Sequence, residues 1–331
     1  MLGRMIRLAG AAALFMLTAC ISTAAPMKSD DVYLFSSFRD NGQDGLHLAY
    51  STDGLTWTAL KSDASYLAPQ VGGNLMRDPC ILRGPDGEFH MVWTTGWWEN
   101  NIGIAHSRDL IHWSAETALP VMADFPGVMN TWAPEIIYDS GAHRYLIFWS
   151  SSVPGAFPET ADRGDIRSTT GLGLNHRIYY TSTRDFRTYA PTAVFYDGGF
   201  VSIDATIVQD GRRYIMFIKD ETKRPAPEKN IRIAIAAAPG GPYGPASPPI
   251  TPAGLWSEGP TAIKIGDEFY LYYDAYMAPQ HMGAARSRDL IHWEDITAQV
   301  HFPPGTRHGT VFRVEHAVLD RLLAAQGTTT P

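Results

Sequence analysis

Ser107-Arg108-Asp109-Leu110-Ile111-His112-Trp113 is the stretch that decides the fold, because it recurs without change at residues 287–293. Looser copies of the same pattern occur at residues 51–57, 182–189 and, in degenerate form, 236–243. Each clear copy follows an alternating, strand-like run such as Ile102-Gly103-Ile104-Ala105. The repeat therefore predicts a strand, a tight turn and a second short strand that opens on an aromatic residue.

A second pattern recurs upstream of four of these copies. It consists of a strand that carries a motif, a turn such as Gly84-Pro85-Asp86-Gly87, and a strand rich in aromatic residues. The motif strands start near residues 77, 132, 203 and 258. Together the two patterns give units of four strands, repeated at intervals of roughly 50–70 residues, and this is typical of the blades of a β-propeller.

The number of blades depends on the two ends of the pattern. Residues 31–60 hold three strands of a blade without an inner strand, and residues 307–314 hold one strand with no blade after it. Joined in space, they complete a fifth blade and close the ring, which removes open sheet edges. We therefore predict an all-β, five-bladed β-propeller over residues 31–314, followed by a C-terminal helix and tail at 315–331. An open sandwich with a ragged first sheet is the alternative.

The composition excludes several classes of protein. Of the 331 residues, 45% are hydrophobic and only 18% are charged, which argues against an intrinsically disordered chain. Two cysteines cannot form a disulfide framework. The net charge of −7 argues against a nucleic-acid partner, because such proteins usually present a basic face. Aromatic residues make up 11% of the chain, and they suit both strands and stacking on sugar rings.

The N-terminus has the pattern of a targeting segment. A short basic region precedes an apolar run at residues 8–17 that is too short for a comfortable membrane span. Leu17-Thr18-Ala19-Cys20 then resembles a bacterial lipobox, in which Cys20 becomes the lipidated first residue. We therefore expect a lipoprotein signal peptide over 1–19, a linker over 20–30, and a periplasmic or cell-surface protein that contacts the membrane only through its lipid anchor. A plain signal peptide cut elsewhere, giving a secreted protein, is the alternative.

Acidic residues stand near the start of each motif strand, and the first strand of a propeller blade lines the central channel. The residues that this rule brings together are Asp78, Glu135, Asp204 and Glu258, with His308 in the fifth blade. Carboxylates held close to one another raise each other's pKa, so some of them are protonated near neutral pH. A protonated carboxyl group is what a general acid requires.

Taken in order and at blade spacing, the five motifs resemble glycoside hydrolase family 43 over about residues 31–314. The motifs are Arg77-Asp78-Pro79, Trp132-Ala133-Pro134-Glu135, Ser202-Ile203-Asp204-Ala205, Glu258-Gly259-Pro260 and Arg307-His308-Gly309. The resemblance implies a five-bladed propeller that hydrolyses glycosidic bonds by single displacement, with inversion. It also implies that Asp78 is the general base, Glu258 the general acid, and Asp204 a third carboxylate that orients the acid and raises its pKa.

Inverting hydrolysis also requires one general base and one general acid. The two carboxyl groups must lie roughly 6.5–9.5 Å apart, with a water between them. The alternative is that these carboxylates only cap turns. For Glu135, substrate hydrogen bonding and organisation of the channel are both open. Arg307 is expected to contact a sugar hydroxyl or to pair with the carboxylates. The resemblance places His308 near an ion or a water cluster on the propeller axis. A histidine alone is a poor calcium ligand, because calcium prefers oxygen. Two interpretations therefore stay open, a structural Ca²⁺ and a hydrogen bond from His308 to axial water, and no cofactor is expected to be required.

Aromatic side chains near the carboxylates are candidates for stacking on a sugar ring. Trp93, Trp97 and Trp98 lie at or just past the end of one predicted strand, and Trp132 opens the next motif strand. Packing between blades is the rival interpretation. The long segment at residues 152–175 lacks a regular pattern and is a candidate lid that narrows the pocket and favours exo attack.

Together these observations predict an exo-acting α-L-arabinofuranosidase whose partner is an oligo- or polysaccharide. The choice of arabinose follows from what the family most often does. β-D-xylosidase or galactosidase activity on the same scaffold is the alternative within enzymes, and a propeller that binds surface glycans without turnover is the alternative outside them. The intact set of Asp78, Asp204 and Glu258 argues against the last, because a binding protein gains nothing from three crowded carboxylates.

Overall fold

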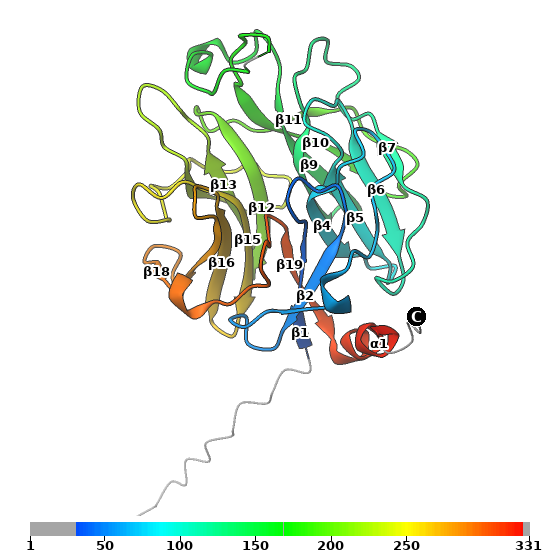
Figure 1. The fold of residues 1–331 in the computed structure, drawn as a ribbon. Coiled ribbons are helices and arrows are strands. Elements are labelled where there is room, and N and C mark those ends of the chain that lie inside the picture. The colour runs from blue at the N-terminus through cyan, green and yellow to red at the C-terminus, as the bar shows by residue number, and fades with distance from the viewer. Residues whose placement is uncertain (1–30, 168, 327–331) are drawn as a thin grey trace, which may run out of the picture. The chain divides into compact units, whose positions relative to one another are not determined.

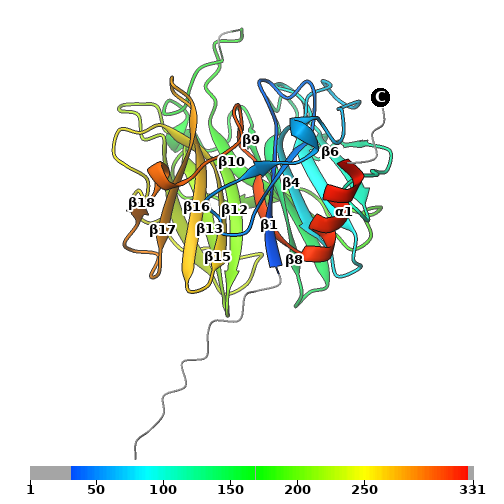
Figure 2. The same ribbon diagram turned by 60° about the horizontal axis from the view of Figure 1, so that its bottom comes forward.

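The computed structural model describes residues 31–326 except Ser168, and these residues form five antiparallel sheets arranged around one axis (Figures 1 and 2). The predicted all-β fold with five blades is therefore confirmed. The signal peptide, the linker and the lipidation site at Cys20 lie outside the described residues. Within the described part, no helix combines the length and the apolar character needed to cross a membrane.

Each blade is one sheet, and its first-named strand lies nearest the axis. Blade I contains β4 (Arg77–Arg83), β5 (Phe89–Thr94), β6 (Ile102–Ser107) and β7 (Thr117–Leu119). Blade II contains β8 (Trp132–Asp139), β9 (Arg144–Ser152), β10 (His176–Thr183) and β11 (Ala193–Tyr196). Blade III contains β12 (Ser202–Asp210), β13 (Arg213–Asp220) and β14 (Asn230–Ala236). Blade IV contains β15 (Ser257–Ile265), β16 (Glu268–Ala275), β17 (His281–Ser287) and β18 (Glu294–Asp295).

Blade V closes the ring from both ends of the described chain. Its strands are, from the axis outward, β19 (Thr310–Glu315), β1 (Asp31–Ser37), β2 (His47–Ser51) and β3 (Thr58–Ala59). Strands β19 and β1 pair antiparallel from Asp31 opposite Glu315 to Ser36 opposite Thr310. The predicted closure is thus confirmed, and helix α1 (His316–Gln326) follows β19 directly. Short 3-10 helices occur at Lys61–Asp63, Pro158–Thr160 and Thr297–Gln299.

The exact sequence repeat forms a turn that its own side chains hold together. In the first copy, the Ser107 hydroxyl accepts a hydrogen bond from the Leu110 amide at 2.9 Å, and Asp109 accepts from the amides of Ile111 and His112 at 2.9 and 2.8 Å. The copy at residues 287–293 repeats these three bonds. The backbone stays in the left-handed region at the leucine of both copies, with φ of 66°. The repeat therefore serves structure rather than chemistry.

Blade III departs from the four-strand pattern at its outer edge. The degenerate copy of the repeat there is followed by a segment that contains Pro245, Pro248 and Pro249. Proline has no amide hydrogen, so this segment cannot form a full ladder. Three backbone bonds to β14 remain, from the amides of Gly244, Ser247 and Ile250. The sheet therefore has three strands and an irregular fourth edge.

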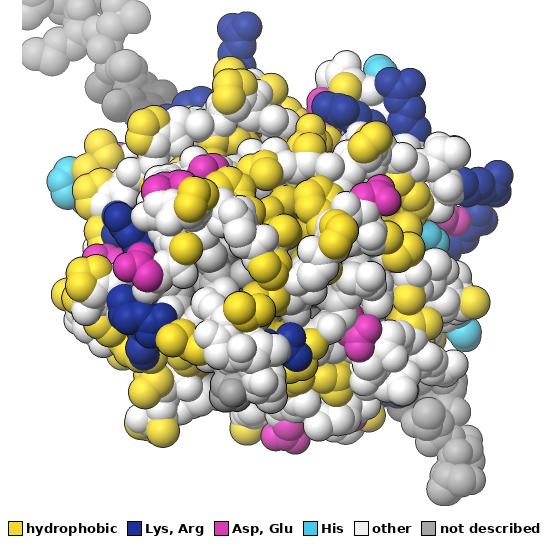
Figure 3. Space-filling view, turned by 90° about the horizontal axis from the view of Figure 1, so that it is seen from above, with side chains coloured by type: hydrophobic (Ala, Val, Ile, Leu, Met, Phe, Trp, Pro, Cys, Tyr) yellow, Lys and Arg dark blue, Asp and Glu magenta, His cyan; other side chains and the backbone are white. Residues whose placement is uncertain are grey.

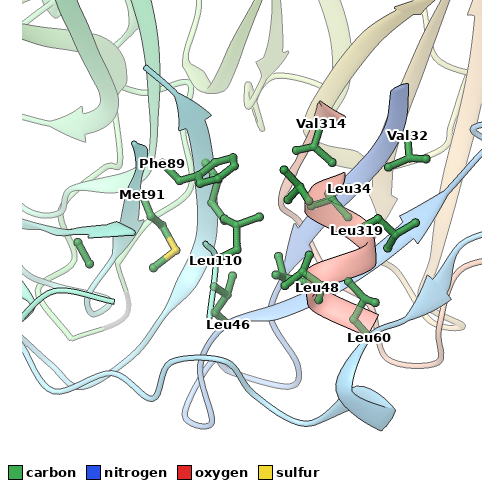
Figure 4. Close-up of a cluster of buried hydrophobic side chains, with 14 of the residues drawn as sticks. Val32, Leu34, Leu46, Leu48, Leu60, Phe89, Met91, Leu110, Val314 and Leu319 are labelled. Carbon is green, nitrogen blue, oxygen red and sulfur yellow. The ribbon is translucent and has the colours of Figure 1, made fainter. Parts of the chain in front are cut away.

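Hydrophobic side chains fill the spaces between neighbouring blades. The cluster between blades V and I joins residues of β1, β2, β19, β5 and helix α1, including Leu34, Met91 and Leu319 (Figure 4). Trp93 belongs to this cluster and has 0% of its surface exposed. A Cβ on Gly103 of the neighbouring strand would lie 2.0 Å from the Trp93 ring, so the glycine makes room for the indole. The prediction that Trp93 contacts substrate is therefore corrected: Trp93 packs between blades.

The outer surface carries charges of both signs. On the face shown in Figure 3, Lys and Arg side chains lie mainly toward the rim, separated by hydrophobic and uncharged side chains. The described residues on this face therefore do not form a broad basic patch.

Candidate active site

Four inner strands share an irregularity at the same point. The pairing of β4, β8, β12 and β15 with the next strand shifts register at Arg77/Cys80, Trp132/Glu135, Ile203/Thr206 and Glu258/Thr261. The residues at these bulges have positive φ: Asp78 53°, Ala133 47°, Asp204 52° and Gly259 55°. Non-glycine residues rarely adopt this conformation, and β-bulges beside active sites redirect side chains. The bulges turn the side chains of Asp78 and Asp204 toward a common space.

A pocket of about 230 Å³ lies at the bulges. It is lined by Arg77, Asp78, Trp97, Trp132, Asp165, Leu174, His176, Ile203, Asp204, Glu221, Glu258 and His308. The structure thus brings the three predicted catalytic carboxyl groups, Asp78, Asp204 and Glu258, into one pocket. Glu258 immediately precedes its bulge, whereas Glu135 follows its bulge by two residues and does not line the pocket. The acidic residues near the strand starts are therefore not equivalent in position.

Asp78 is held from two sides. Thr94 donates a hydrogen bond to its Oδ2 at 2.7 Å, and the Nδ1 of His308 lies 3.3 Å from its Oδ1. Thr94 is itself oriented by the amide of Ala133, which donates to its hydroxyl at 2.8 Å. The side chain of Asp78 is thus held in one orientation, with the imidazole of His308 beside it.

Asp204 and Glu258 form a neighbouring pair with opposite pKa shifts. Burial raises the pKa of Asp204 to about 6, and the nearby charges of Glu258 and Asp78 add to this, against the effect of His308 and Lys219. Its Oδ2 accepts a hydrogen bond from the amide of Gly259 at 3.1 Å. Of the two carboxyl groups, Asp204 therefore keeps its proton to the higher pH.

Glu258 lies among cations. The Nζ of Lys219 is 3.0 Å from its Oε2, and a guanidinium nitrogen of Arg307 is 3.6 Å from its Oε1. Burial alone raises the pKa of Glu258, but Lys219, with His308 and Arg307, outweighs burial and leaves that pKa below its usual value. The predicted role of Asp204 in raising the pKa of the acid stays a prediction, and the net direction for Glu258 is set by the cations.

Lys219 belongs to a chain of alternating charges that motif reading missed. Its Nζ also lies 2.6 Å from Glu221, Glu221 pairs with Lys229, and Lys229 lies 2.8 Å from Asp165. Both lysines are 1% exposed, so each buried cation is matched by carboxylates. The available signal was the charged end of β13, where Lys219-Asp220-Glu221 follows an apolar run.

Glu135 lies deeper on the axis than the pocket. Its carboxylate accepts hydrogen bonds from Thr310 at 3.0 Å, Thr206 at 3.2 Å and the thiol of Cys80 at 3.3 Å. Burial raises its pKa to about 7. Of the two open roles, these contacts favour organisation of the channel, and the assignment of Glu135 to substrate binding is corrected.

Arg307 and His308 both pair with carboxylates. Arg307 Nε lies 2.5 Å from Asp274, and this side chain is not among those that line the pocket. Burial lowers the pKa of His308, but Asp78, Asp204 and Glu258 outweigh burial and raise it. A structural Ca²⁺ near His308 stays a prediction, and calcium prefers oxygen ligands over an imidazole nitrogen. Among the described residues, the group with metal-binding spacing is Asp86, Glu88 and His90 in blade I.

Two of the predicted tryptophans reach the pocket. Trp97 is 42% exposed, and its ring packs edge-on against that of Trp132, with 5.8 Å between centroids. The indole of Trp132 donates to the carbonyl of Trp97 at 2.8 Å. Trp98 is also exposed but lies under the guanidinium of Arg167, outside the lining. Trp97 and Trp132 therefore remain candidates for stacking on a sugar.

The long segment between β9 and β10 contributes Asp165 and Leu174 to the pocket. It is fastened by Arg177, which is fully buried and donates to Thr160 at 2.8 Å, and by Asn175, which donates to the carbonyl of Phe157 at 2.8 Å. The segment expected as a lid therefore lines one side of the pocket through Asp165 and Leu174.

Comparison with known proteins agrees with this architecture. Residues 30–320 match a family model related to family 43 and described as "Probable glycosyl hydrolase domain". An alpha-L-arabinofuranosidase from Bifidobacterium longum subsp. longum is 24% identical over an alignment of 275 positions that covers 74% of this chain. The match spans 24% of that protein, so the chain covers about a quarter of this curated relative.

Two solved structures show the likeness in fold. An alpha-L-arabinofuranosidase from Lactobacillus brevis matches with a TM-score of 0.51 and 21% identity, over 66% of this chain and 72% of the other. A thermostable family-43 glycoside hydrolase matches with a TM-score of 0.51 and 17% identity, over 70% of this chain and 74% of the other.

Proposed function

The chain belongs to glycoside hydrolase family 43, and on that premise we propose that it is a glycosidase, namely an inverting, exo-acting α-L-arabinofuranosidase. The observation that carries the proposal is the meeting of Asp78, Asp204 and Glu258 in one pocket from three different blades. Asp78 and Glu258 belong to inner strands on either side of blade V, whose His308 contacts Asp78 and packs against Gly259. The proposed mechanism requires room for a sugar and a water between this base and this acid.

In the proposed reaction, Asp78 takes a proton from water while the water oxygen attacks the anomeric carbon. Glu258 gives its proton to the departing glycosidic oxygen as the bond from that oxygen to the anomeric carbon breaks. One bond forms and one breaks in a single displacement, so the anomeric configuration inverts. Asp78 ends protonated and Glu258 ionised, and exchange with solvent restores both groups.

The cations around Glu258 favour this step once the proton is in place. Lys219 and Arg307 stabilise the carboxylate that forms when Glu258 loses its proton, which makes protonated Glu258 a stronger acid. The same cations reduce the fraction of Glu258 that is protonated near neutral pH. Asp204, with a pKa of about 6, holds its proton to a higher pH than Glu258, whose pKa lies below its usual value, and solvent returns the proton of Glu258 after each turnover.

The pocket supports attack on chain ends. Its volume of about 230 Å³ is below the roughly 300–1,000 Å³ of pockets for drug-sized ligands, which suits one terminal sugar residue better than a polymer. The wall formed by Asp165 and Leu174 limits its extent. The choice of L-arabinofuranose is supported by the relative from B. longum, whose name gives that activity.

The test is hydrolysis of a panel of nitrophenyl glycosides that includes α-L-arabinofuranoside, β-D-xyloside and β-D-galactoside, with the first product anomer identified by NMR. We expect release from the arabinofuranoside with inversion, loss of turnover in Asp78→Asn, and a smaller loss in Glu258→Ala, because a nitrophenolate leaving group needs little protonation. Asp86→Asn, in the exposed turn of the same blade as Asp78, is the matched control and keeps wild-type activity.

The outcomes separate the parts of the proposal. Faster release from the xyloside or galactoside would overturn the choice of sugar. Retention of configuration would overturn the mechanism, and turnover that survives in Asp78→Asn would remove Asp78 as the base.

We also propose that Cys20 carries a lipid that anchors the protein at a periplasmic or cell-surface membrane. This proposal is supported only by Leu17-Thr18-Ala19-Cys20, outside the described residues. In cell fractionation, Cys20→Ala is expected to move the protein from the membrane to the soluble fraction; an unchanged distribution would contradict the anchor.

A further inference from the structure

The pocket contains a buried polar side chain that none of the steps above uses. His176 opens β10, lines the pocket and is 1% exposed. Neither of its ring nitrogens has a hydrogen-bond partner among the described residues. Buried polar atoms are almost always paired, so an unpaired histidine at a pocket wall indicates a partner that arrives with the ligand.

The backbone on both sides of His176 is fixed. The side chain of Asn175 donates to the carbonyls of Phe157 and Ala156 at 2.8 and 3.1 Å. The guanidinium of Arg177 donates to Asp197 at 2.6 Å and to the carbonyl of His176 itself at 2.9 Å. The strand that carries the imidazole is therefore held in place beside the pocket.

The charge state of His176 suits a hydroxyl group. Burial lowers its pKa to about 4; Glu221 and Asp165 raise that pKa, and Lys229 and Lys219 lower it further. The imidazole is therefore neutral near pH 7, with one nitrogen that donates a hydrogen bond and one that accepts. A sugar hydroxyl also does both, whereas a carboxylate only accepts and an ammonium only donates.

An aromatic surface lies next to the imidazole. The ring of Trp132 is 5.0 Å from that of His176, tilted by 36°. An apolar ring face beside a neutral donor and acceptor matches a sugar, which presents C–H groups on one side and hydroxyls at its edge.

We propose that His176 is a substrate-binding residue that hydrogen bonds a hydroxyl of a neutral sugar lying against Trp132. The inference deepens the proposed function, since it takes a sugar as the ligand of this pocket. It assigns His176 to binding and specificity, apart from the proton transfers of Asp78 and Glu258.

Two substitutions separate binding from structure. His176→Phe keeps a planar ring but removes both polar nitrogens, and we expect KM for the preferred nitrophenyl glycoside to rise at least tenfold while the melting temperature stays equal or rises. His176→Gln keeps a donor and an acceptor, and we expect it to recover part of the affinity. His47→Gln is the control, because His47 is a buried histidine already paired with Asp44 and Asp63 outside the pocket.

The second measurement does not need turnover. In protein with ¹⁵N-labelled histidine, addition of free L-arabinose, D-xylose or D-galactose is expected to shift the ring nitrogens of His176, assigned by their loss in His176→Phe. Unmoved His176 signals with every sugar, or an unchanged KM in folded His176→Phe, would overturn the proposal. If the enzyme hydrolyses a glycoside but the His176 ring nitrogens do not shift with any sugar, only the role of His176 is refuted. If those nitrogens shift but no glycoside is hydrolysed, only the proposed reaction is refuted.

Discussion

Replacing Lys219 with methionine tests the electrostatics of the proposed acid most directly. The change removes a buried cation whose Nζ lies 3.0 Å from Glu258 and 2.6 Å from Glu221. Glu221 keeps Lys229 as a partner, and Glu258 keeps Arg307 at 3.6 Å. The variant therefore weakens the positive surroundings of Glu258 without leaving that carboxylate alone.

The size of the effect follows from the distance. Two unit charges 3.0 Å apart attract by about 5 kcal/mol at an effective dielectric constant of about 20, and by about 1 kcal/mol in bulk water. Because 1.36 kcal/mol corresponds to about one pKa unit, the pKa of Glu258 should rise by about 1 to 4 when Lys219 is lost. The sign is fixed, since removal of a cation always favours the protonated carboxyl group.

The assay is the pH dependence of kcat/KM. In the wild type, we expect a bell-shaped profile whose alkaline limb reflects loss of the proton that Asp204 and Glu258 share, near the pKa of about 6 of Asp204. In Lys219→Met the alkaline limb should move to higher pH by at least about one pH unit. Lys219→Arg keeps the charge and should keep the wild-type limb.

Stability must be followed in parallel, because removal of one partner of a buried ion pair costs about 3–5 kcal/mol. Lys264→Met is the control, since it removes a lysine paired with Asp210 at 2.6 Å outside the pocket. If the alkaline limb stays in place or moves to lower pH in folded Lys219→Met, the claim that Lys219 lowers the pKa of the acid Glu258 is refuted.

Three further predictions follow from single contacts. Glu258→Gln should lower kcat/KM by about 10²–10⁴-fold for a glycoside with an alkyl leaving group, and much less for a dinitrophenyl glycoside, which needs no proton; equal losses on both substrates would exclude Glu258 as the acid. Burial raises the pKa of Glu135 from 4.5 to about 7, so the folded protein keeps a proton that the unfolded chain loses over this range, and the free energy of unfolding falls by about 3 kcal/mol as pH rises. In Glu135→Gln, the free energy of unfolding measured with urea should not fall between the lower and the upper end of this pH range. If it falls as much as in the wild type, Glu135 does not have the raised pKa. Gly259→Ala places a Cβ 2.2 Å from the His308 ring at a φ of 55°, so kcat/KM should fall at least about tenfold and unfolding free energy by about 1–3 kcal/mol; activity within twofold of wild type would show that His308 has room to move.

The elements that sequence reasoning predicted well depend on short-range chemistry. The turn at residues 107–113 is held by side chains that bond amides two or three positions along the chain, so its pattern is complete within seven residues. Closure of blade V was also predictable, because the missing inner strand at the start and the extra strand at the end complement each other. The carboxyl groups of Asp78, Asp204 and Glu258 were found through motifs that repeat at blade spacing.

The predictions that Trp93 and Glu135 contact substrate are wrong because burial and strand register decide which side chains reach the pocket. Trp93 and Trp132 both stand at the ends of inner or second strands, and an alternating pattern does not say which face of a blade meets its neighbour and which meets the pocket. Trp93 is buried between blades V and I, whereas Trp132 lines the pocket. The sequence places Glu135 with the other acids, because the bulge that shifts its register does not appear as a gap in the sequence.

By itself, the order of residues in this chain determined five blades, their closure and the three carboxylates that meet at the axis, because turns, strand alternation and repeated motifs are local properties. Only the tertiary structure decided that Lys219 lies against Glu258, that Asp204 rather than Glu258 has the raised pKa, and that His176 is buried without a partner. A pKa and an unpaired nitrogen depend on every charge and dipole within a few ångströms, and those neighbours come from blades far apart in the chain.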